Sequence, residues 1–436
     1  MQKKIILSAI FILLISFPLN SQDGSIFKLF QNPEVPNGPV LAILPYGDTI
    51  FVGGSFHFWG PPIGSFGVFD LATGDVDLDF FRLSTPVYKI LLDNNGGFYI
   101  CGSGSMGTKN LLKRDGTSKS FNSIIHVNPD GSVDENFNAP SFKPYTNAPI
   151  HSMALYDTIL FVLGNFQKVN DSSRTYLAAL DARTGKVLPW KTDSIAFNSL
   201  WKSGIAVYDT TLYVYGDIQQ VGDSIRTGIA AFDIRTGKLL PWNPKVKGEV
   251  HSIAVYNNIV YIGGDFDSVG TYKRSNLAAI NKITGEVTNW APNASSYVYA
   301  LKVYGSKLFV GGSFERIDTV RRENIACFDL ATGQLTNWQA NVIFTLRLKS
   351  STGSYSSYYV PDYFSLGVYD IEIVDSTLFI AGDNLNAFIT TGTDTVIKYG
   401  IRSIRSCHWK LKKLGWLCVI WRCTYFGIFC IRRYDK

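Results

Sequence analysis

The sequence has few of the residues and motifs on which most enzymes depend. Its 436 residues include only five His and three Met, and none of its six cysteines is adjacent to another. It contains no phosphate loop, no nucleophile elbow and no convincing pair of catalytic acids. We therefore assign no catalytic, cofactor-binding or metal-binding residue and expect no cofactor. A role other than catalysis is favoured.

Charged residues are also scarce, at 17% of the chain, and the formal charge of +6 is unevenly placed. From Ile401 to the end there are nine Lys or Arg and one acid, Asp435. The rest of the chain holds 32 Lys and Arg against 34 Asp and Glu, a net charge of −2. This balance gives no electrostatic basis for binding nucleic acid.

The N-terminus carries the one apolar run that suggests targeting. Lys3 and Lys4 precede a 13-residue, mainly apolar stretch at 5–17, and a small residue, Ser21, follows. That run is too short to span a bilayer comfortably, but the order of charge, apolar run and small residue is typical of a signal peptide. We predict a signal peptide at residues 1–21 and a secreted or cell-surface protein.

The body of the chain is built from repeats rich in β-forming residues. Aromatic residues make up 14% of the chain, and 39 residues are glycine. One unit contains four short runs, at 250–256, 259–266, 276–281 and 286–290, separated by turn residues. Such runs predict four antiparallel strands in an all-β protein.

A glycine in the second run marks each copy of the unit. Sheets of this size cannot bury both faces alone, so stacking them around an axis covers each with its neighbour. We predict a β-propeller over residues 22–399, with seven four-stranded blades. The marker glycines lie 48 to 70 residues apart, at Gly54, Gly102, Gly164, Gly216, Gly264, Gly312 and Gly382.

The last unit is expected to be completed by the N-terminus. It offers strands at 368–374, 377–381 and 395–399, which leaves the outer fourth strand missing. Residues 26–30 precede the first full unit at the place of a fourth strand, so we predict that they close the ring beside residues 395–399. Residues 403–409 are the competing candidate.

Two resemblances to known repeats support this interpretation. Residues 125–137, which read IHVNPDGSVDENF, resemble the delta-60 repeat of secreted bacterial proteins. Residues 179–190, which read ALDARTGKVLPW, resemble the tryptophan-docking motif of PQQ quinoproteins, as do 231–242, 279–290 and 327–338. The resemblances imply a propeller, in which the turn glycine shapes a hairpin and the Trp packs between blades. They imply no particular chemistry, because fold does not fix function.

Two histidines and four tryptophans recur at fixed places in the repeat. His151 and His251 follow Ile or Val in their units, and a ring of imidazoles binding metal is one interpretation. Repetition alone explains them as strand-edge residues, which we favour. Blade packing is likewise favoured over a glycan platform for the tryptophans. These are Trp190, Trp242, Trp290 and Trp338.

Two sets of aspartates admit similar alternatives. Asp75, Asp77 and Asp79 share one face of a predicted strand and could hold Ca²⁺, although a solvated face is favoured. A second set occupies the turn between the first and second runs, where turn chemistry is favoured over glycosylation of the neighbouring hydroxyls. That set is Asp48, Asp157, Asp209 and Asp375.

Cysteine placement separates the body from the tail. Cys101 and Cys327 lie in strand-like runs and are predicted to be buried thiols, whereas the other four cysteines follow residue 400. The repeat pattern stops there, so residues 400–436 form an aberrant basic tail. It is either a membrane-associating or disulfide-bearing segment, or the product of a frameshift. We favour the frameshift, because a one-base shift in codons for residues 415–425 can encode a sequence that resembles residues 300–309 of the repeat. A surface-sorting domain would then be missing.

Together these features predict an exported, non-catalytic binding or scaffold module for an unidentified protein or glycan. The alternative is an enzyme of the quinoprotein or polysaccharide-lyase type, with its site in the central channel. Convergent carboxylates, His or Arg at one mouth of the channel favour the enzyme. A channel lined by Gly, Ser and backbone favours the module.

Overall fold

The computed structural model describes residues 39–56, 64–70, 77, 80–103, 123–143, 149–338, 367–374 and 377–382. It also describes the backbone of six short strands: β1 (Ile15–Ser16), β2 (Phe27–Lys28), β9 (Leu111–Leu112), β10 (Ser118–Lys119), β33 (Ile389–Thr391) and β34 (Asp394–Val396). The described part is all-β, without a helix, and its strands form many small antiparallel sheets. The predicted all-β class is confirmed. The tail from residue 400 lies outside the described residues.

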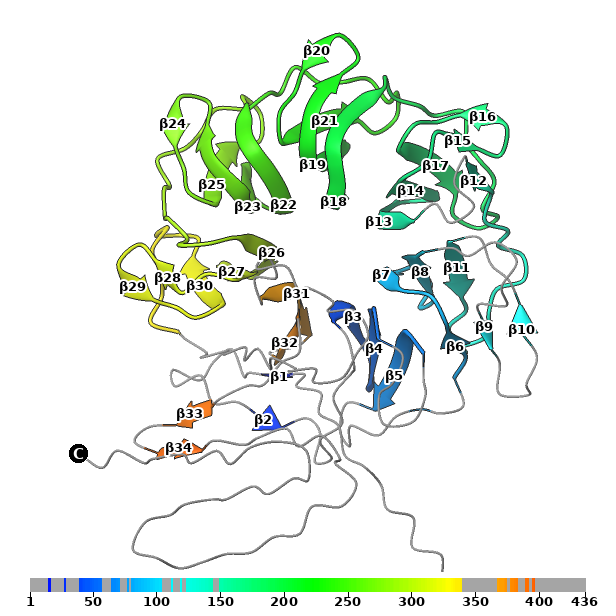
Figure 1. Cartoon of the computed structure of the whole chain (residues 1–436), viewed down its shortest axis with the longest axis horizontal. Coiled ribbons are helices and arrows are strands. Elements are labelled where there is room, and N and C mark those ends of the chain that lie inside the picture. The colour runs from blue at the N-terminus through cyan, green and yellow to red at the C-terminus, as the bar shows by residue number, and fades with distance from the viewer. Residues whose placement is uncertain are drawn as a thin grey trace, which may run out of the picture.

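The first strand of each repeat unit lies innermost, and these strands face a common centre (Figure 1). Each inner strand contacts the inner strand of the next unit, and the last contacts the first. The inner strands are β3 (Val40–Tyr46), β7 (Val87–Leu92), β13 (Ile150–Tyr156), β18 (Ile195–Tyr208), β22 (Val246–Tyr256), β26 (Val298–Tyr304) and β31 (Val368–Val374).

Each inner strand forms a hairpin with a second strand, and in six units a third strand follows. The second strands are β4 (Thr49–Gly54), β8 (Phe98–Gly102), β14 (Ile159–Gly164), β19 (Thr211–Val221), β23 (Ile259–Val269), β27 (Lys307–Gly312) and β32 (Thr377–Gly382). The third strands are β5 (Phe66–Asp70), β11 (Ile124–Val127), β17 (Leu177–Asp181), β21 (Ile229–Asp233), β25 (Leu277–Asn281) and β30 (Ile325–Asp329).

Short strands lie at the outer edge of the units, which we call the rim. These strands are β6 (Arg82–Leu83), β12 (Phe142–Lys143), β15 (Lys168–Val169), β16 (Ser172–Ser173), β20 (Ser224–Ile225), β24 (Tyr272–Lys273), β28 (Arg316–Ile317) and β29 (Val320–Arg321). Two of them, β20 and β24, pair with the outer end of a second strand, and the others form small separate sheets (Figure 1).

The fourth run of the unit is shorter than predicted. In the unit of β22 it makes two backbone hydrogen bonds, from Asn281 N–H to Glu286 and from Thr288 N–H to Ala279, and one isolated bridge at Val287. Beyond the bridge, the Trp290 ring packs 5.2 Å from the Tyr261 ring of its own sheet and 5.1 Å from the Phe328 ring of the next unit. The expectation of four full strands is therefore corrected to three strands and a bridge.

The turn before that run is built by side-chain hydrogen bonds. Asp181 Oδ1 accepts from the backbone N–H of Thr184 at 2.8 Å and from its hydroxyl at 2.7 Å. The hydroxyl bond is the main reason that the pKa of Asp181 lies below its ordinary value. Gly185 follows at a φ of 74°, which favours glycine. The same turn recurs at Asp233, Asn281 and Asp329.

The core lies between neighbouring units rather than within one. Phe161 and Ala179 of one unit pack with Ile205 and Val214 of the next in one buried cluster. This arrangement agrees with the prediction that each sheet covers its neighbour. Cys101 and Cys327 are each 1% exposed and unbridged, so the prediction of two buried thiols is confirmed.

The predicted strand closure differs from the structure. β2 pairs with β1, and β34 pairs with β33, so Phe27–Lys28 does not pair with Asp394–Val396 among the described residues. The first and last units meet instead through β3 and β31. The first and last units can meet without the predicted outer strand because neighbouring units contact one another through their inner strands. Residues 29–30, 397–399 and 403–409 lie outside the described residues.

We expect Gly264→Ala to destabilise the protein by about 1–3 kcal/mol, because overpacking forces the backbone to move. A Cβ at Gly264 would lie 2.0 Å from the backbone oxygen of Glu249. Urea unfolding measures the change, with Asp267→Ala on the exposed end of the same strand as the control. Equal midpoints for the two variants would contradict the prediction.

A candidate central binding pocket

The centre of the structure is lined by residues of all seven inner strands. The pairing of six inner strands with their second strands shifts register at the same place, near the strand start. At each shift the inner strand has one more residue than its partner strand, which is a β-bulge. A bulge changes the direction in which the side chain of the added residue points. The residues at these positions are Leu41, Tyr88, His151, His251, Tyr299 and Tyr369.

The marker glycine of the repeat lies opposite this bulge. Gly264 pairs with Val250, the residue before His251. Gly54 and Gly312 pair with Val40 and Val298 in the same way. A side chain there would collide with the carbonyl oxygen that the bulge pushes inward. The repeated glycine thus permits the bulge that points a side chain to the centre.

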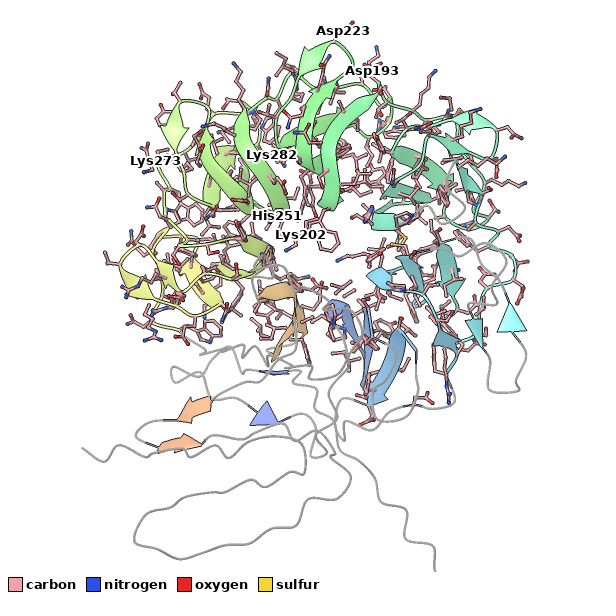
Figure 2. All side chains as sticks on the ribbon, in the orientation of Figure 1. Asp193, Lys202, Asp223, His251, Lys273 and Lys282 are labelled. Atoms are coloured by element: carbon pink, nitrogen blue, oxygen red, sulfur yellow. The ribbon has the colours of Figure 1, made fainter. Side chains whose placement is uncertain are left out.

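The inner strand β18 departs from this pattern by an insertion. Its register shifts between Ser199 and Gly204, and the added residues include Trp201 and Lys202. Two local bonds fix them: Trp201 N–H donates to Ser199 Oγ at 3.1 Å, and the Ser203 hydroxyl donates to the Leu200 oxygen at 2.7 Å. Lys202 has a φ of 60°. Figure 2 shows Lys202 and His251 near the centre, whereas Lys273 lies at the rim.

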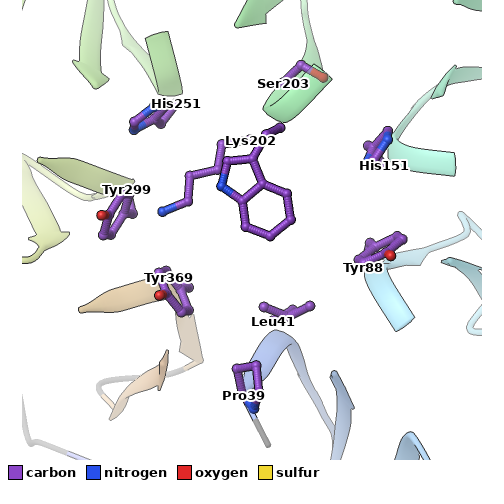
Figure 3. Close-up of a pocket in the computed structure, with 10 residues that line it drawn as sticks. Pro39, Leu41, Tyr88, His151, Lys202, Ser203, His251, Tyr299 and Tyr369 are labelled. Atoms are coloured by element: carbon purple, nitrogen blue, oxygen red, sulfur yellow. The ribbon is translucent and has the colours of Figure 1, made fainter. Parts of the chain in front are cut away.

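These residues enclose a cavity of about 210 Å³ (Figure 3). Aromatic and imidazole rings supply most of its wall. Trp201 is 62% exposed, so its indole remains open to a ligand. The ten lining residues are Pro39, Leu41, Tyr88, His151, Trp201, Lys202, Ser203, His251, Tyr299 and Tyr369.

Ring contacts hold the wall in place. The His151 and Tyr88 rings stack with centroids 5.5 Å apart, and His251 stacks on Tyr299 at the same distance. The Lys202 ammonium lies over the face of Tyr299, 3.1 Å from its centroid, and 4.7 Å from that of Tyr369. A cation over two ring faces is a favourable cation–π arrangement. It ties the insertion of β18 to β26 and β31 across the centre.

The two histidines have different environments. Burial lowers the pKa of His151 to about 4, so its imidazole is neutral at neutral pH. His251 is 6% exposed, and its Nε2 lies 3.3 Å from Glu249 Oε2. Its Nδ1 is buried and has no hydrogen-bond partner in the described part of the chain. Neutral imidazole offers one donor and one acceptor, which suits hydroxyl groups.

A charged layer lies next to the pocket. Asp370 follows the pocket residue Tyr369, and its carboxylate is the main reason that the pKa of Lys89 is raised above its ordinary value. Lys302 Nζ lies 2.6 Å from Glu372 Oε2, while burial raises the pKa of that carboxyl. The layer places charges beside the aromatic wall without adding a carboxylate to the pocket lining.

The residue after each bulge also joins neighbouring units. Ser152 Oγ accepts a hydrogen bond from Ile205 N–H at 3.2 Å, and Ser252 Oγ accepts one from Leu301 N–H at 3.0 Å. Asp370 Oδ2 accepts from Ile43 N–H at 3.2 Å in the same relation. The last unit therefore meets the first as the other neighbours meet.

The structure assigns the recurring tryptophans to packing. The indole N–H of Trp242 donates to the backbone oxygen of Asn281, and that of Trp290 to Gly333, each at 3.0 Å and each in the next unit. Their rings meet aromatic side chains of the second strand edge-on. The packing interpretation is confirmed, and the same edge-on contact occurs at Trp190 and Trp338.

The other candidates divide between confirmed turns and positions outside the described residues. Asp157 and Asp209 have φ of 51° and 52° in two-residue hairpin turns, as turn chemistry predicts, and Asp48 lies in the matching turn. Asp77 is exposed, but Asp75, Asp79 and Asp375 lie outside the described residues. Within that part, no group of three or more His, Cys, Asp or Glu could hold a metal ion.

His151 and His251 both line the pocket, which the favoured interpretation as strand-edge residues did not anticipate. The sequence also missed Lys202 and Trp201, because they lie in an insertion that breaks the repeat. In the part of the chain that is described, we find no helix with the length and hydropathy needed to cross a bilayer.

Comparison with known proteins adds little. No family model matches the chain, and no curated protein matches it. A similar solved structure is the crystal structure of the computationally designed Ika8 protein. Its identity is 14% and its TM-score 0.44, and the match covers 80% of this chain and 94% of that chain. At that TM-score the likeness supports no argument.

His151 is expected to make stability depend on pH. The unfolded chain takes up a proton near pH 6.5, whereas the folded imidazole does so only near 4. Stability should therefore fall by about 2–3 kcal/mol as the pH drops from 6.5 to 4. His151→Phe should remove this part of the pH dependence in urea unfolding at several pH values. An unchanged slope in the variant would contradict the prediction.

Proposed function

We propose that the chain is an exported, seven-bladed β-propeller that acts as a binding module, with its ligand in the central pocket. The propeller is supported by the contacts between successive inner strands. It is also supported by the hydrogen bond from Ile43 to Asp370, which joins the last unit to the first in the way that Ser152 and Ser252 join other neighbours. Export and a location outside the cytoplasm are inferred from residues 1–21. The resemblance to the delta-60 and quinoprotein repeats agrees with this fold.

One observation carries the functional proposal: six bulges and one insertion aim side chains from seven units into a single pocket. Ligand pockets are typically lined by apolar and aromatic groups with a few polar atoms that fix orientation. This pocket has that composition. Among the described residues that line it, none is a carboxylate or an Arg, the groups that would most favour an enzyme.

The enzyme of the lyase or quinoprotein type remains the second candidate because of one contact. His251 lies against Glu249, and its second nitrogen has no partner in the described part of the chain. A carboxylate that orients an imidazole is an arrangement found in general bases. On this alternative, His251 would take a proton from the ligand.

Glycan and protein arrays probed with the purified protein test the proposal. We expect a small set of related ligands, and we expect Tyr88→Ala to weaken their binding at least tenfold. Tyr272→Ala is the matched control, because Tyr272 is 54% exposed at the tip of an outer hairpin. Binding that survives Tyr88→Ala but not the control substitution would place the site elsewhere. Conversion of a bound ligand to product would favour the enzyme.

A further inference from the structure

Among the described residues, one side chain supplies the formal charge of the pocket lining. Among the ten lining residues, Lys202 is the one with a formal charge. His151 is neutral at neutral pH because its burial lowers its pKa. A cationic ligand would therefore meet the like charge of the Lys202 ammonium, whereas an anionic group would be attracted to it. Charge complementarity favours a ligand that carries an anion.

Lys202 is also held in a fixed position. Its ammonium lies over the faces of Tyr299 and Tyr369. The attraction between a cation and a ring face leaves the formal charge in place. Since the rings and the bonded insertion restrict the side chain, a ligand that binds here loses less side-chain entropy.

The remainder of the wall suits a flat, hydroxylated ring. Trp201 is adjacent to Lys202, lines the same pocket and is 62% exposed. An exposed indole offers a rigid face on which the carbon–hydrogen face of a sugar ring can pack, and aromatic groups carry much of the binding energy in such sites. The neutral imidazole of His151 and the hydroxyl of Tyr88 can each donate or accept a hydrogen bond from sugar hydroxyls.

We propose that the central pocket binds an acidic sugar, with its carboxylate on the Lys202 ammonium and its ring against Trp201. This inference rests on the binding module proposed above and names its class of ligand. The acid group, the ring face and the hydroxyls each have a matching feature in one cavity of about 210 Å³. An acidic peptide would match the ammonium but would leave the indole and imidazole without their partners.

Calorimetric titration of the full-length protein with oligogalacturonate, its methyl-esterified form, acetate and polyglutamate tests the proposal. We expect oligogalacturonate to bind at least tenfold more tightly than the ester. Lys202→Met should remove that preference, because it keeps the length of the side chain and loses the charge. Trp201→Ala should weaken both sugars about tenfold, whereas Trp201→Phe should retain most of the binding.

The matched control is Lys273→Met, which removes an exposed lysine at the rim of the molecule (Figure 2). Equal unfolding midpoints for the two lysine variants would show that neither has lost its fold. Equal affinity for acid and ester, or an acid preference that survives Lys202→Met, would overturn the acidic sugar and leave the binding module standing. Tight binding of acetate or polyglutamate would also overturn it. A ligand that is insensitive to both Tyr88→Ala and Trp201→Ala would overturn the pocket itself.

Discussion

Replacing Asp370 by alanine is expected to lower the free energy of unfolding by about 2–4 kcal/mol, because the Lys89 ammonium loses its principal counter-charge and the backbone N–H of Ile43 loses its acceptor. Asp370 is the main anion acting on Lys89 and accepts the backbone N–H of Ile43. The variant would leave a positive charge among inner strands without its principal counter-charge. It would also leave an N–H without its partner at the junction of the first and last units. Urea unfolding at neutral pH measures the loss.

Two further variants separate charge from hydrogen bonding at this junction. Asp370→Asn retains an acceptor for Ile43 and should lose less stability than the alanine variant. Asp370→Ala combined with Lys89→Met should recover part of the loss, because the unpaired charge is removed as well. Asp267→Ala is the control, since its exposed pair with Lys247 is worth less than about 1 kcal/mol. A loss at Asp370 no larger than at Asp267 would refute the prediction.

Replacing His126 by leucine is expected to cost about 3–5 kcal/mol, because two buried carboxylates lose their shared partner. His126 Nδ1 lies 2.9 Å from Asp134 Oδ2, and Nε2 lies 3.0 Å from Asp93 Oδ2. The two carboxylate side chains are only 13% and 6% exposed. The ring also stacks on Tyr99, with centroids 4.4 Å apart. Calorimetric unfolding of the variant measures the change.

A pH series adds an independent test of the His126 contacts. Burial raises the pKa of Asp134, but hydrogen bonds from His126 and from the backbone of Asn136 outweigh it, so the net pKa is low. The carboxylate therefore stabilises the fold above its unfolded pKa, near 4, and this contribution is lost as the pH falls through the lower folded value. His126→Leu should weaken this loss at acid pH. If it leaves both the midpoint and the acid limb unchanged, the proposed role of His126 is wrong.

The sequence predicted the parts of the fold that repeat. Hairpin turns, marker glycines and docking tryptophans are all local features, and each recurs with the unit. The sequence did not predict that the fourth run pairs through a single bridge, because the alternation of residues within one unit carries no information on the packing of Trp290 against Tyr261 and the next unit. The sequence also predicted that residues 26–30 close the ring. That prediction came from counting the strands in each unit, and such a count contains no information on contacts between inner strands.

Four arginines also recur with the period of the repeat. Arg174, Arg226, Arg274 and Arg322 lie 52, 48 and 48 residues apart, the spacing of the marker glycines. Each donates from one guanidinium nitrogen to the backbone oxygen 14 residues later, which fastens the outer hairpin to the fourth run. The period alone would have identified these arginines as structural.

The pocket was predictable only in part. His151 and His251 were noted for their shared position, but a pattern of alternating residues cannot show that a bulge turns them toward the centre. Lys202 and Trp201 have no counterpart in the other units, so comparison of repeats passes over them. Sites built on departures from a repeat are the ones that repeat analysis is least able to find.

The bulges affect how the ligand specificity of such a protein can change by mutation. The backbone and the glycine opposite it set the direction of the inward side chain, and none of the six inward residues belongs to the described apolar clusters between units. The positions hold leucine, tyrosine or histidine on the same scaffold. Since the same backbone accepts an aliphatic, a phenolic or an imidazole side chain at this position, the specificity of the pocket can diverge, or be redesigned, on an unchanged frame.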